Sequence, residues 1–97
     1  MRGKREPSIA QLIKVNFKAD ETRALAIMKC ESGGNPKATN YNTNGTRDSG
    51  LFQINSVHAK KVNGDLDSLY DPKVNIRVAK QIHDASGWNA WVCAEKI

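Results

Sequence analysis

Two acidic residues, Glu31 and Asp48, have positions in the sequence that suggest chemistry. Glu31 continues the apolar stripe of a predicted helix, near the end where Gly33 and Gly34 would terminate that helix. An apolar setting and the negative end of the helix dipole both raise the pKa of a carboxyl group. Glu31 would then keep its proton near neutral pH and donate it to a leaving oxygen as a general acid. A helix-end glutamate that turns to solvent is the alternative.

Asp48 lies 17 residues later, in a stretch made almost wholly of Asn, Thr and Gly. Because hydroxyl and amide groups solvate a carboxylate, we expect Asp48 to stay ionised. A protonated carboxyl group paired with an ionised one is what a glycosidase needs for its acid and its anion. An ordinary turn aspartate is the alternative interpretation.

The elements that would position these side chains are mostly helical. Asp20 and Asp71 are typical N-caps, Pro72 suits a first helical position, and Gly33 and Gly87 are typical helix ends. Apolar spacing supports the same boundaries. The predicted helical segments cover residues 8–17, 20–33, 56–62, 71–87 and 88–93.

Residues 39–55 predict a small antiparallel sheet. Asn44-Gly45 is typical of a hairpin turn, and residues 51–54 are expected to form a short, half-buried strand. The predicted fold class is therefore α+β, mostly helical with one small antiparallel sheet. The 97 residues suffice for one domain and are too few for two, and residues 1–7 are expected to be a loose extension.

The net charge of +5 favours anionic partners such as wall polymers, acidic membranes or nucleic acids. The Lys and Arg residues are not interleaved with aromatic residues, which argues against nucleic acid. No run has the length of a transmembrane helix, and the charged residues 1–6 are not followed by the apolar core of a signal peptide. We expect no nucleic-acid partner, no membrane insertion and no export signal in this stretch.

The cysteines and histidines do not predict a metal site. Cys30, Cys93, His58 and His83 lack the spacing of zinc ligands. The loop that starts at Asn40 resembles an EF-hand in its Asn and Gly spacing, but its twelfth residue is Leu and not Glu. We expect no metal and no organic cofactor.

Cys30 and Cys93 admit two interpretations. They form a disulfide that closes most of the domain, or they are buried free thiols in a reducing compartment. We favour the disulfide, because a small domain with an extracellular target gains stability from such a crosslink.

Four motifs in order along the chain resemble the lysozyme-like superfamily. They are CESGGNP at 30–36, NYNTNGTRDSGLFQINS at 40–56, DP and NI within 71–76, and GWNAW at 87–91. The stretch 31–56 is similar to chicken-type lysozymes without a gap, whereas GLFQIN and DPxxNI look equally like lytic transglycosylases. The similarity covers about residues 20–93 and is weakest at 57–70.

The resemblance implies roles for individual residues. Glu31 would be the general acid and Asp48 the nucleophile or charge stabiliser, a pair for which lysozyme is the type example. The substrate-binding positions that it implies are Asn42, Gln53, Asn55, Ala90 and Trp91. Among these, Asn42 would orient the aspartate and Trp91 would pack on the glutamate. His58 falls where lysozymes often carry a cleft tryptophan, and a surface histidine is the simpler interpretation.

The implied function is a peptidoglycan glycosidase, or muramidase, which acts as a monomer on the cell wall. It would cleave the β-1,4 bond between N-acetylmuramic acid and N-acetylglucosamine. One alternative is a lytic transglycosylase, which closes a 1,6-anhydro ring at the same bond and needs only the glutamate. Another is a non-catalytic glycan-binding or modulator protein on the same scaffold, although the presence of both carboxyl groups argues against it.

Overall fold

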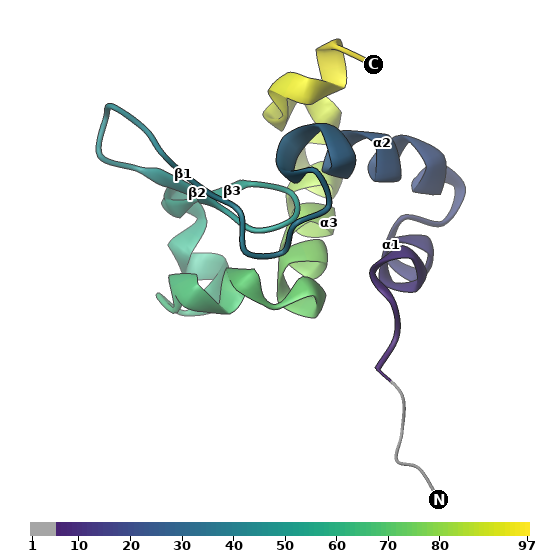
Figure 1. Cartoon of the computed structure of the whole chain (residues 1–97), viewed down its shortest axis with the longest axis horizontal. Helices are drawn as coiled ribbons and strands as arrows, with labels where there is room; N and C mark the ends of the chain where they lie inside the picture. Colours follow the sequence, from purple (N-terminus) through teal and green to yellow (C-terminus); the bar gives the residue numbers. More distant parts are fainter. Residues whose placement is uncertain (1–5) are drawn as a thin grey trace, which may run out of the picture.

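The computed structural model describes residues 6–97 and confirms the predicted α+β class. Its helices are α1 (Ile9–Phe17), α2 (Glu21–Ser32) and α3 (Pro72–Ser86), with short 3₁₀ helices η1 (Lys18–Asp20), η2 (Ser56–Val62), η3 (Leu66–Tyr70), η4 (Gly87–Ala90) and η5 (Val92–Glu95). An antiparallel sheet has the order β1 (Thr39–Tyr41), β2 (Arg47–Ser49), β3 (Ile54–Asn55). In Figure 1, α3 runs between this sheet and the pair α1 and α2. Residues 1–5 of the expected extension lie outside the described residues.

Helix ends lie close to where the sequence predicts them. Ser8 caps α1 in a capping box, with its hydroxyl accepting from the Gln11 N–H at 3.1 Å. The carboxylate of Asp71 accepts from the Lys73 N–H at 2.9 Å at the start of α3. Gly33 ends α2 in the left-handed conformation. Asp20 precedes α2 without a side-chain capping bond, because residues 18–20 already form a 3₁₀ turn.

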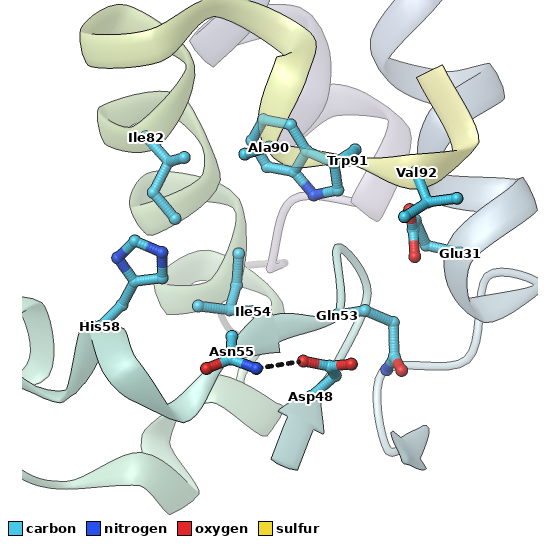
Figure 2. Close-up of a pocket in the computed structure, with 10 residues that line it drawn as sticks. All are labelled: Glu31, Asp48, Gln53, Ile54, Asn55, His58, Ile82, Ala90, Trp91 and Val92. Carbon is cyan, nitrogen blue, oxygen red and sulfur yellow. Dashed lines mark hydrogen bonds between the residues drawn. The ribbon is translucent and has the colours of Figure 1, made fainter. Parts of the chain in front are cut away.

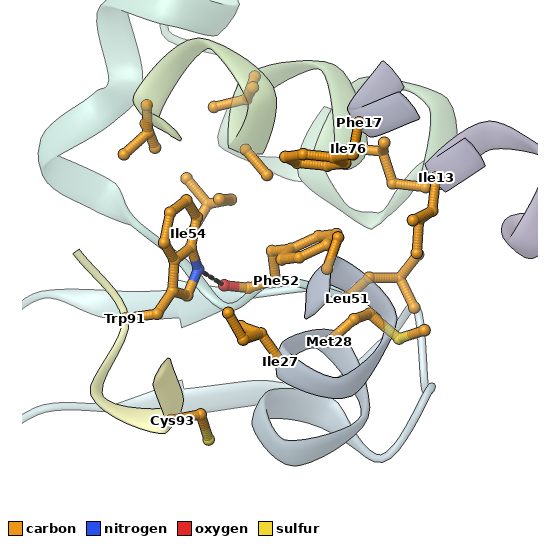
Figure 3. Packing of buried hydrophobic residues seen from close by; sticks show 14 of the residues in the cluster. Ile13, Phe17, Ile27, Met28, Leu51, Phe52, Ile54, Ile76, Trp91 and Cys93 are labelled. Atoms are coloured by element: carbon orange, nitrogen blue, oxygen red, sulfur yellow. Dashed lines mark hydrogen bonds between the residues drawn. The ribbon is translucent and has the colours of Figure 1, made fainter. Parts of the chain in front are cut away.

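The apolar residues of the helices and of the loop after β2 form one core. Figure 3 shows Phe52 at its centre, between Phe17 of α1 and Trp91 near the C-terminus. Burial of each aliphatic or aromatic side chain stabilises the fold by roughly 1.5–3 kcal/mol. The fully buried apolar residues include Ile13, Ala24, Ile27, Leu51, Phe52, Ile76, Val78 and Ala79.

Asn75 fixes the loop that follows Asp48. This buried side chain accepts from the Phe52 N–H at 2.8 Å, and its amide donates to the carbonyls of Ser49 and Leu69, both at 2.9 Å. Gly50 makes room for it, because a Cβ there would lie 2.3 Å from Asn75 Nδ2 and the φ of Gly50 is +78°. One residue of α3 therefore anchors the end of the sheet that carries Asp48.

The prediction of a strand over residues 51–54 is wrong. Leu51 to Gln53 form a turn, and only Ile54 and Asn55 pair with β2. The Phe52 N–H is bonded to Asn75 instead of a strand, and Gln53 has a φ of +50°.

The predicted helix 88–93 is also wrong, since Trp91 is extended (φ −112°, ψ 122°) and separates η4 from η5. The short helix η3 has no counterpart in the prediction.

Cys30 and Cys93 form a disulfide, with 5.9 Å between their Cα atoms. The bond joins the last turn of α2 to η5 across a sequence separation of 63 residues. Closing a loop of this length stabilises a small domain by roughly 4 kcal/mol on the chain-entropy model.

Candidate active site

A cleft of about 200 Å³ lies between the sheet and the helices, and both candidate acids line it. Asp48 reaches it from β2 and Glu31 from the last turn of α2 (Figure 2). Among the residues that the sequence predicts for the site, the structure brings together Glu31, Asp48, Gln53, Asn55, Ala90 and Trp91. Asn42 does not line the cleft and lies beside Asp48 instead, with 3.3 Å between its Nδ2 and Asp48 Oδ2.

Glu31 occupies a setting that favours its protonated form. The side chain is partly buried, and burial is the main cause that raises its pKa above the ordinary value of a glutamate. The negative charge of Asp48 adds to this effect. Two groups oppose it, namely the N–H of Cys93, which donates to Glu31 Oε2 at 3.3 Å, and the positive charge of Lys96. The net direction suits a proton donor.

Asp48 is held as an acceptor by amide groups. Asn55, its partner across β2 and β3, donates to Asp48 Oδ1 at 2.9 Å, as Figure 2 shows. Asn42 donates to Oδ2, so each carboxylate oxygen accepts one bond. Thr46 links the two amides, since its hydroxyl oxygen accepts from both at 3.0 and 3.1 Å.

The two acids differ in their partners and not in their exposure. Both side chains are partly buried, whereas the sequence predicts one buried and one solvated carboxyl group. Asp48 accepts from two amide side chains, and Glu31 accepts from one backbone N–H at a longer distance. The arrangement therefore gives Glu31 the setting of a proton donor and holds both carboxyl oxygens of Asp48 in fixed positions.

Gln53 and Asn55 line the cleft with side chains that are already bonded within the protein. The amide of Gln53 donates to the carbonyls of Ala38 and Gly50 at 3.1 and 3.0 Å and accepts from Asn40 at 2.6 Å. The carbonyl of Asn55 accepts from the Val57 N–H at 3.0 Å. These side chains therefore shape the cleft wall and orient Asp48.

Trp91 forms the base of the opposite wall. It is 5% exposed, and its indole N–H donates to the carbonyl of Phe52 at 2.8 Å (Figure 3). Its ring packs against Phe52 and Trp88, with centroid distances of 6.0 and 5.4 Å. Ala90 is exposed beside it on the same wall.

His58 and three apolar residues complete the cleft. The resemblance places His58 at a cleft position, but a surface histidine is the simpler interpretation, and the sequence does not assign the apolar residues to the cleft. The apolar residues are Ile54, Ile82 and Val92. His58 lies at a kink of η2 (φ −88°, ψ 19°), a backbone region where many active-site residues occur. Burial is the main cause that lowers its pKa, and the charge of Lys61 adds to it. Ile82 belongs to the apolar stripe of α3. This stripe predicts a buried face, and nothing in its spacing indicates that Ile82 also lines a cleft.

The described residues contain neither a metal-binding cluster nor a membrane-spanning helix. Across residues 6–97, His, Cys, Asp and Glu side chains do not gather in groups of three that could hold a metal ion. In the same range, no helix combines the length and the apolar character that a membrane crossing requires.

The chain is similar to known lysozyme-like proteins. Residues 10–93 match the family model described as a lysozyme-like domain. Lysozyme C II of Oncorhynchus mykiss is 41% identical over 81 residues, which cover 70% of this chain and 56% of the lysozyme. Protein IpgF of Shigella flexneri is 49% identical over 37 residues, 38% of this chain and 24% of IpgF. The chain thus spans about half the length of the first of these relatives and about a quarter of the second.

The family match extends over most of the chain and includes the cleft residues from Glu31 to Trp91. The mostly helical fold with a small antiparallel sheet agrees with it. On both grounds, this chain belongs to the lysozyme-like domain family.

Proposed function

We propose that this protein is a glycosidase that cleaves peptidoglycan between N-acetylmuramic acid and N-acetylglucosamine. The observation that carries the proposal is the pair in the cleft: a partly buried Glu31 with a raised pKa, opposite an Asp48 that two amides hold. Such a pair supplies the acid and the anion of glycoside cleavage. The similarity to a lysozyme supports the same substrate class.

In the proposed reaction, Glu31 gives its proton to the glycosidic oxygen as the bond to the anomeric carbon breaks. Positive charge develops at that carbon, and Asp48 stabilises it or bonds to it. Glu31, now ionised, takes a proton from water, and the hydroxide adds to the anomeric carbon; where Asp48 has bonded to that carbon, this bond breaks and the carboxylate of Asp48 is released. The products are two shorter glycans that together carry one added water, and Glu31 is protonated again.

The remaining expectations follow from this substrate. The enzyme would act on the cell wall, outside the cytoplasm of the cell that it attacks, and would require no metal or organic cofactor. We expect a monomer, because a long glycan strand needs an open cleft. Size-exclusion chromatography with light scattering tests the oligomeric state.

Replacement of Glu31 tests the proposal directly. We expect Glu31→Gln to lower the rate of peptidoglycan clearing by at least about 100-fold, the usual minimum contribution of a general acid. Glu95→Gln is the matched control, because Glu95 is exposed on η5 and does not line the cleft. Both variants should keep the circular dichroism spectrum of the parent. Clearing by Glu31→Gln at the rate of the control would contradict the role of Glu31 as the acid, and absence of clearing by the parent would favour a glycan-binding protein.

A lytic transglycosylase is the second candidate, and one observation favours it. Both oxygens of Asp48 already accept bonds from Asn42 and Asn55, which suits a fixed electrostatic role better than bond formation. In a transglycosylase the hydroxyl of the sugar itself attacks the anomeric carbon, so only Glu31 is needed.

The masses of the released muropeptides distinguish the two reactions. Hydrolysis adds one water to the products, and 1,6-anhydro ring closure adds none. We expect hydrolysis, with Asp48→Asn lowering the rate roughly 100-fold or more if the ionised side chain stabilises the transition state. Anhydro products, together with a nearly unchanged rate in Asp48→Asn, would establish the transglycosylase instead.

A further inference from the structure

The acid of the cleft depends on a segment that is distant in sequence. Residues 91–96, called here the C-terminal segment, supply the Cys93 N–H and the charge of Lys96 that act on Glu31. They also supply Trp91 and Val92, two residues of the cleft wall, and Figure 2 shows Val92 next to Glu31. The position of this segment therefore determines both the shape of the cleft and the protonation of its acid.

The C-terminal segment has little structure of its own to hold it in place. Its helix η5 is a 3₁₀ helix of four residues, a type with poor hydrogen-bond geometry. Three hydrogen bonds hold this segment from other elements: the Trp91 indole to Phe52, the Cys93 N–H to Glu31, and the Arg23 guanidinium to the Ala94 carbonyl at 3.4 Å. Three of its side chains, those of Trp91, Cys93 and Ala94, are also buried in the core. The one covalent link is the Cys30–Cys93 disulfide.

The disulfide is placed at the acid itself. Cys30 immediately precedes Glu31 on α2, and Cys93 is the residue whose N–H donates to the Glu31 carboxylate. The covalent bond thus joins the two pieces of backbone that must stay in register for this hydrogen bond to form. A crosslink that served stability alone would work equally well away from the cleft.

We propose that the Cys30–Cys93 disulfide positions Glu31 for catalysis by holding the C-terminal segment against the last turn of α2. The oxidised chain is the competent form, and the chain with two thiols has a displaced cleft wall. This inference rests on the proposed role of Glu31 as the acid.

The pH dependence of the rate separates positioning from mere stabilisation. Burial is the main cause of the raised pKa of Glu31, and release of the segment uncovers the carboxyl group while removing Cys93 and Lys96 from it. The pKa then falls toward the ordinary value of a glutamate. Because a general acid acts only when protonated, the alkaline limb of the rate profile moves to lower pH.

The test compares the full chain with Cys30→Ser/Cys93→Ser on soluble peptidoglycan fragments, at a temperature where circular dichroism shows both folded. We expect the rate at pH 7 to fall roughly 100-fold, the scale of a misplaced catalytic group, and the alkaline limb to move to lower pH. Reduction of the parent by a dithiol, which becomes a cyclic disulfide as two thiols form, should do the same, and reoxidation should restore the rate.

Ile13→Ala is the control for lost stability. Ile13 is fully buried in α1 and does not line the cleft, so this variant weakens the core while the disulfide stays intact. Its alkaline limb should coincide with that of the parent. If the serine variant has the rate and the alkaline limb of the parent, the inference is overturned. It is also overturned if the alkaline limb of Ile13→Ala shifts as far as that of the serine variant.

Lys96→Gln keeps the test decisive if the serine variant does not fold. The charge of Lys96 lowers the pKa of Glu31, so its loss should move the limb of the oxidised protein to higher pH. In the reduced chain, where the segment is released, the same substitution should have no effect. Absence of any shift in the oxidised protein would contradict the coupling between the C-terminal segment and the pKa of Glu31.

The outcomes also separate this inference from the proposed function. If the oxidised parent cleaves no glycan, the proposed function fails; if it cleaves and reduction changes nothing, only this inference fails.

Discussion

Glu31 carries its carboxyl group in a place where the charged form is poorly solvated, and this has a consequence for stability. The pKa of Glu31 is raised in the folded protein, chiefly by burial, so the folded state holds the proton at a pH where the unfolded chain has released it. Between the two pKa values the folded state binds more protons, and stability falls as pH rises. The residue that we propose as the acid therefore reduces the stability of the protein at neutral pH.

We predict that Glu31→Gln stabilises the protein at pH 7. The amide bears no charge, so it avoids the desolvation that the carboxylate suffers, and its oxygen still accepts from the Cys93 N–H. At a pH below the pKa of an unfolded glutamate, the variant and the parent should have similar free energies of unfolding. The difference between them should grow as pH rises through the pKa of Glu31 in the folded protein. Urea unfolding at pH 7 and at a pH below the pKa of an unfolded glutamate measures this difference, with Glu95→Gln as the control. A variant less stable than the parent at pH 7 would contradict the assigned environment.

The residue types of the site could be predicted from the sequence, but their detailed roles could not. Helical spacing placed Glu31 at the end of α2, which the structure confirms. Nothing in the spacing of the residues indicates that Cys93, 62 residues away, donates to this carboxylate. The same limit applies to Gln53, whose amide bonds to Ala38 and Asn40 depend on a left-handed turn that follows Gly50.

At the scale of elements, the connection between α3 and the sheet determines where Asp48 lies. Asn75 bonds one backbone group on each side of the turn at Gly50 and a third, the Leu69 carbonyl, on η3. This turn leads from β2 to β3. A run such as Leu51 to Ile54 looks like a strand because its members are apolar. The long-range bond from Asn75 to Phe52 makes it a turn, and local pattern reasoning has no access to such a contact. Helices α1 and α3 were predictable, since their caps are local.

We predict that Asn75→Ala destabilises the protein by about 3 kcal/mol, because it leaves one buried N–H and two buried carbonyls without their partner. Asn89→Ala is the control, since Asn89 is exposed on η4, and it should change stability by less than about 0.5 kcal/mol. Chemical denaturation of both variants gives the difference. A loss below about 1 kcal/mol in Asn75→Ala would show that the turn at Gly50 is held by other contacts.

At the scale of the whole molecule, the charge of the chain suits the proposed substrate. The net charge is +5, and exposed basic residues lie on separate elements, including Lys14 on α1, Lys60 on η2 and Arg77 on α3. A positive field concentrates a protein near an anionic polymer and raises the rate of encounter. The wall as a whole, and not only the sugars in the cleft, would then contribute to activity.

This attraction predicts a salt dependence that differs between substrates. Raising the ionic strength from about 0.01 M to about 0.15 M shortens the Debye length from about 30 Å to about 8 Å. We expect the rate on intact anionic cell walls to fall roughly tenfold or more over this range, the scale of steering effects, while the rate on a short neutral oligosaccharide stays nearly constant. Equal losses on both substrates would place the salt effect in the cleft and not in the long-range field.

Charge reversal far from the cleft tests the same idea without a change of salt. Lys14 and Arg77 are exposed and do not line the cleft. Each reversal to glutamate removes two units, so Lys14→Glu/Arg77→Glu lowers the net charge from +5 to +1. The double variant should lose activity on walls at low salt, keep its rate on the neutral oligosaccharide, and show a flatter salt dependence than the parent. A salt dependence as steep as that of the parent would mean that a local cluster of charges, and not the overall charge of the molecule, governs binding to the wall.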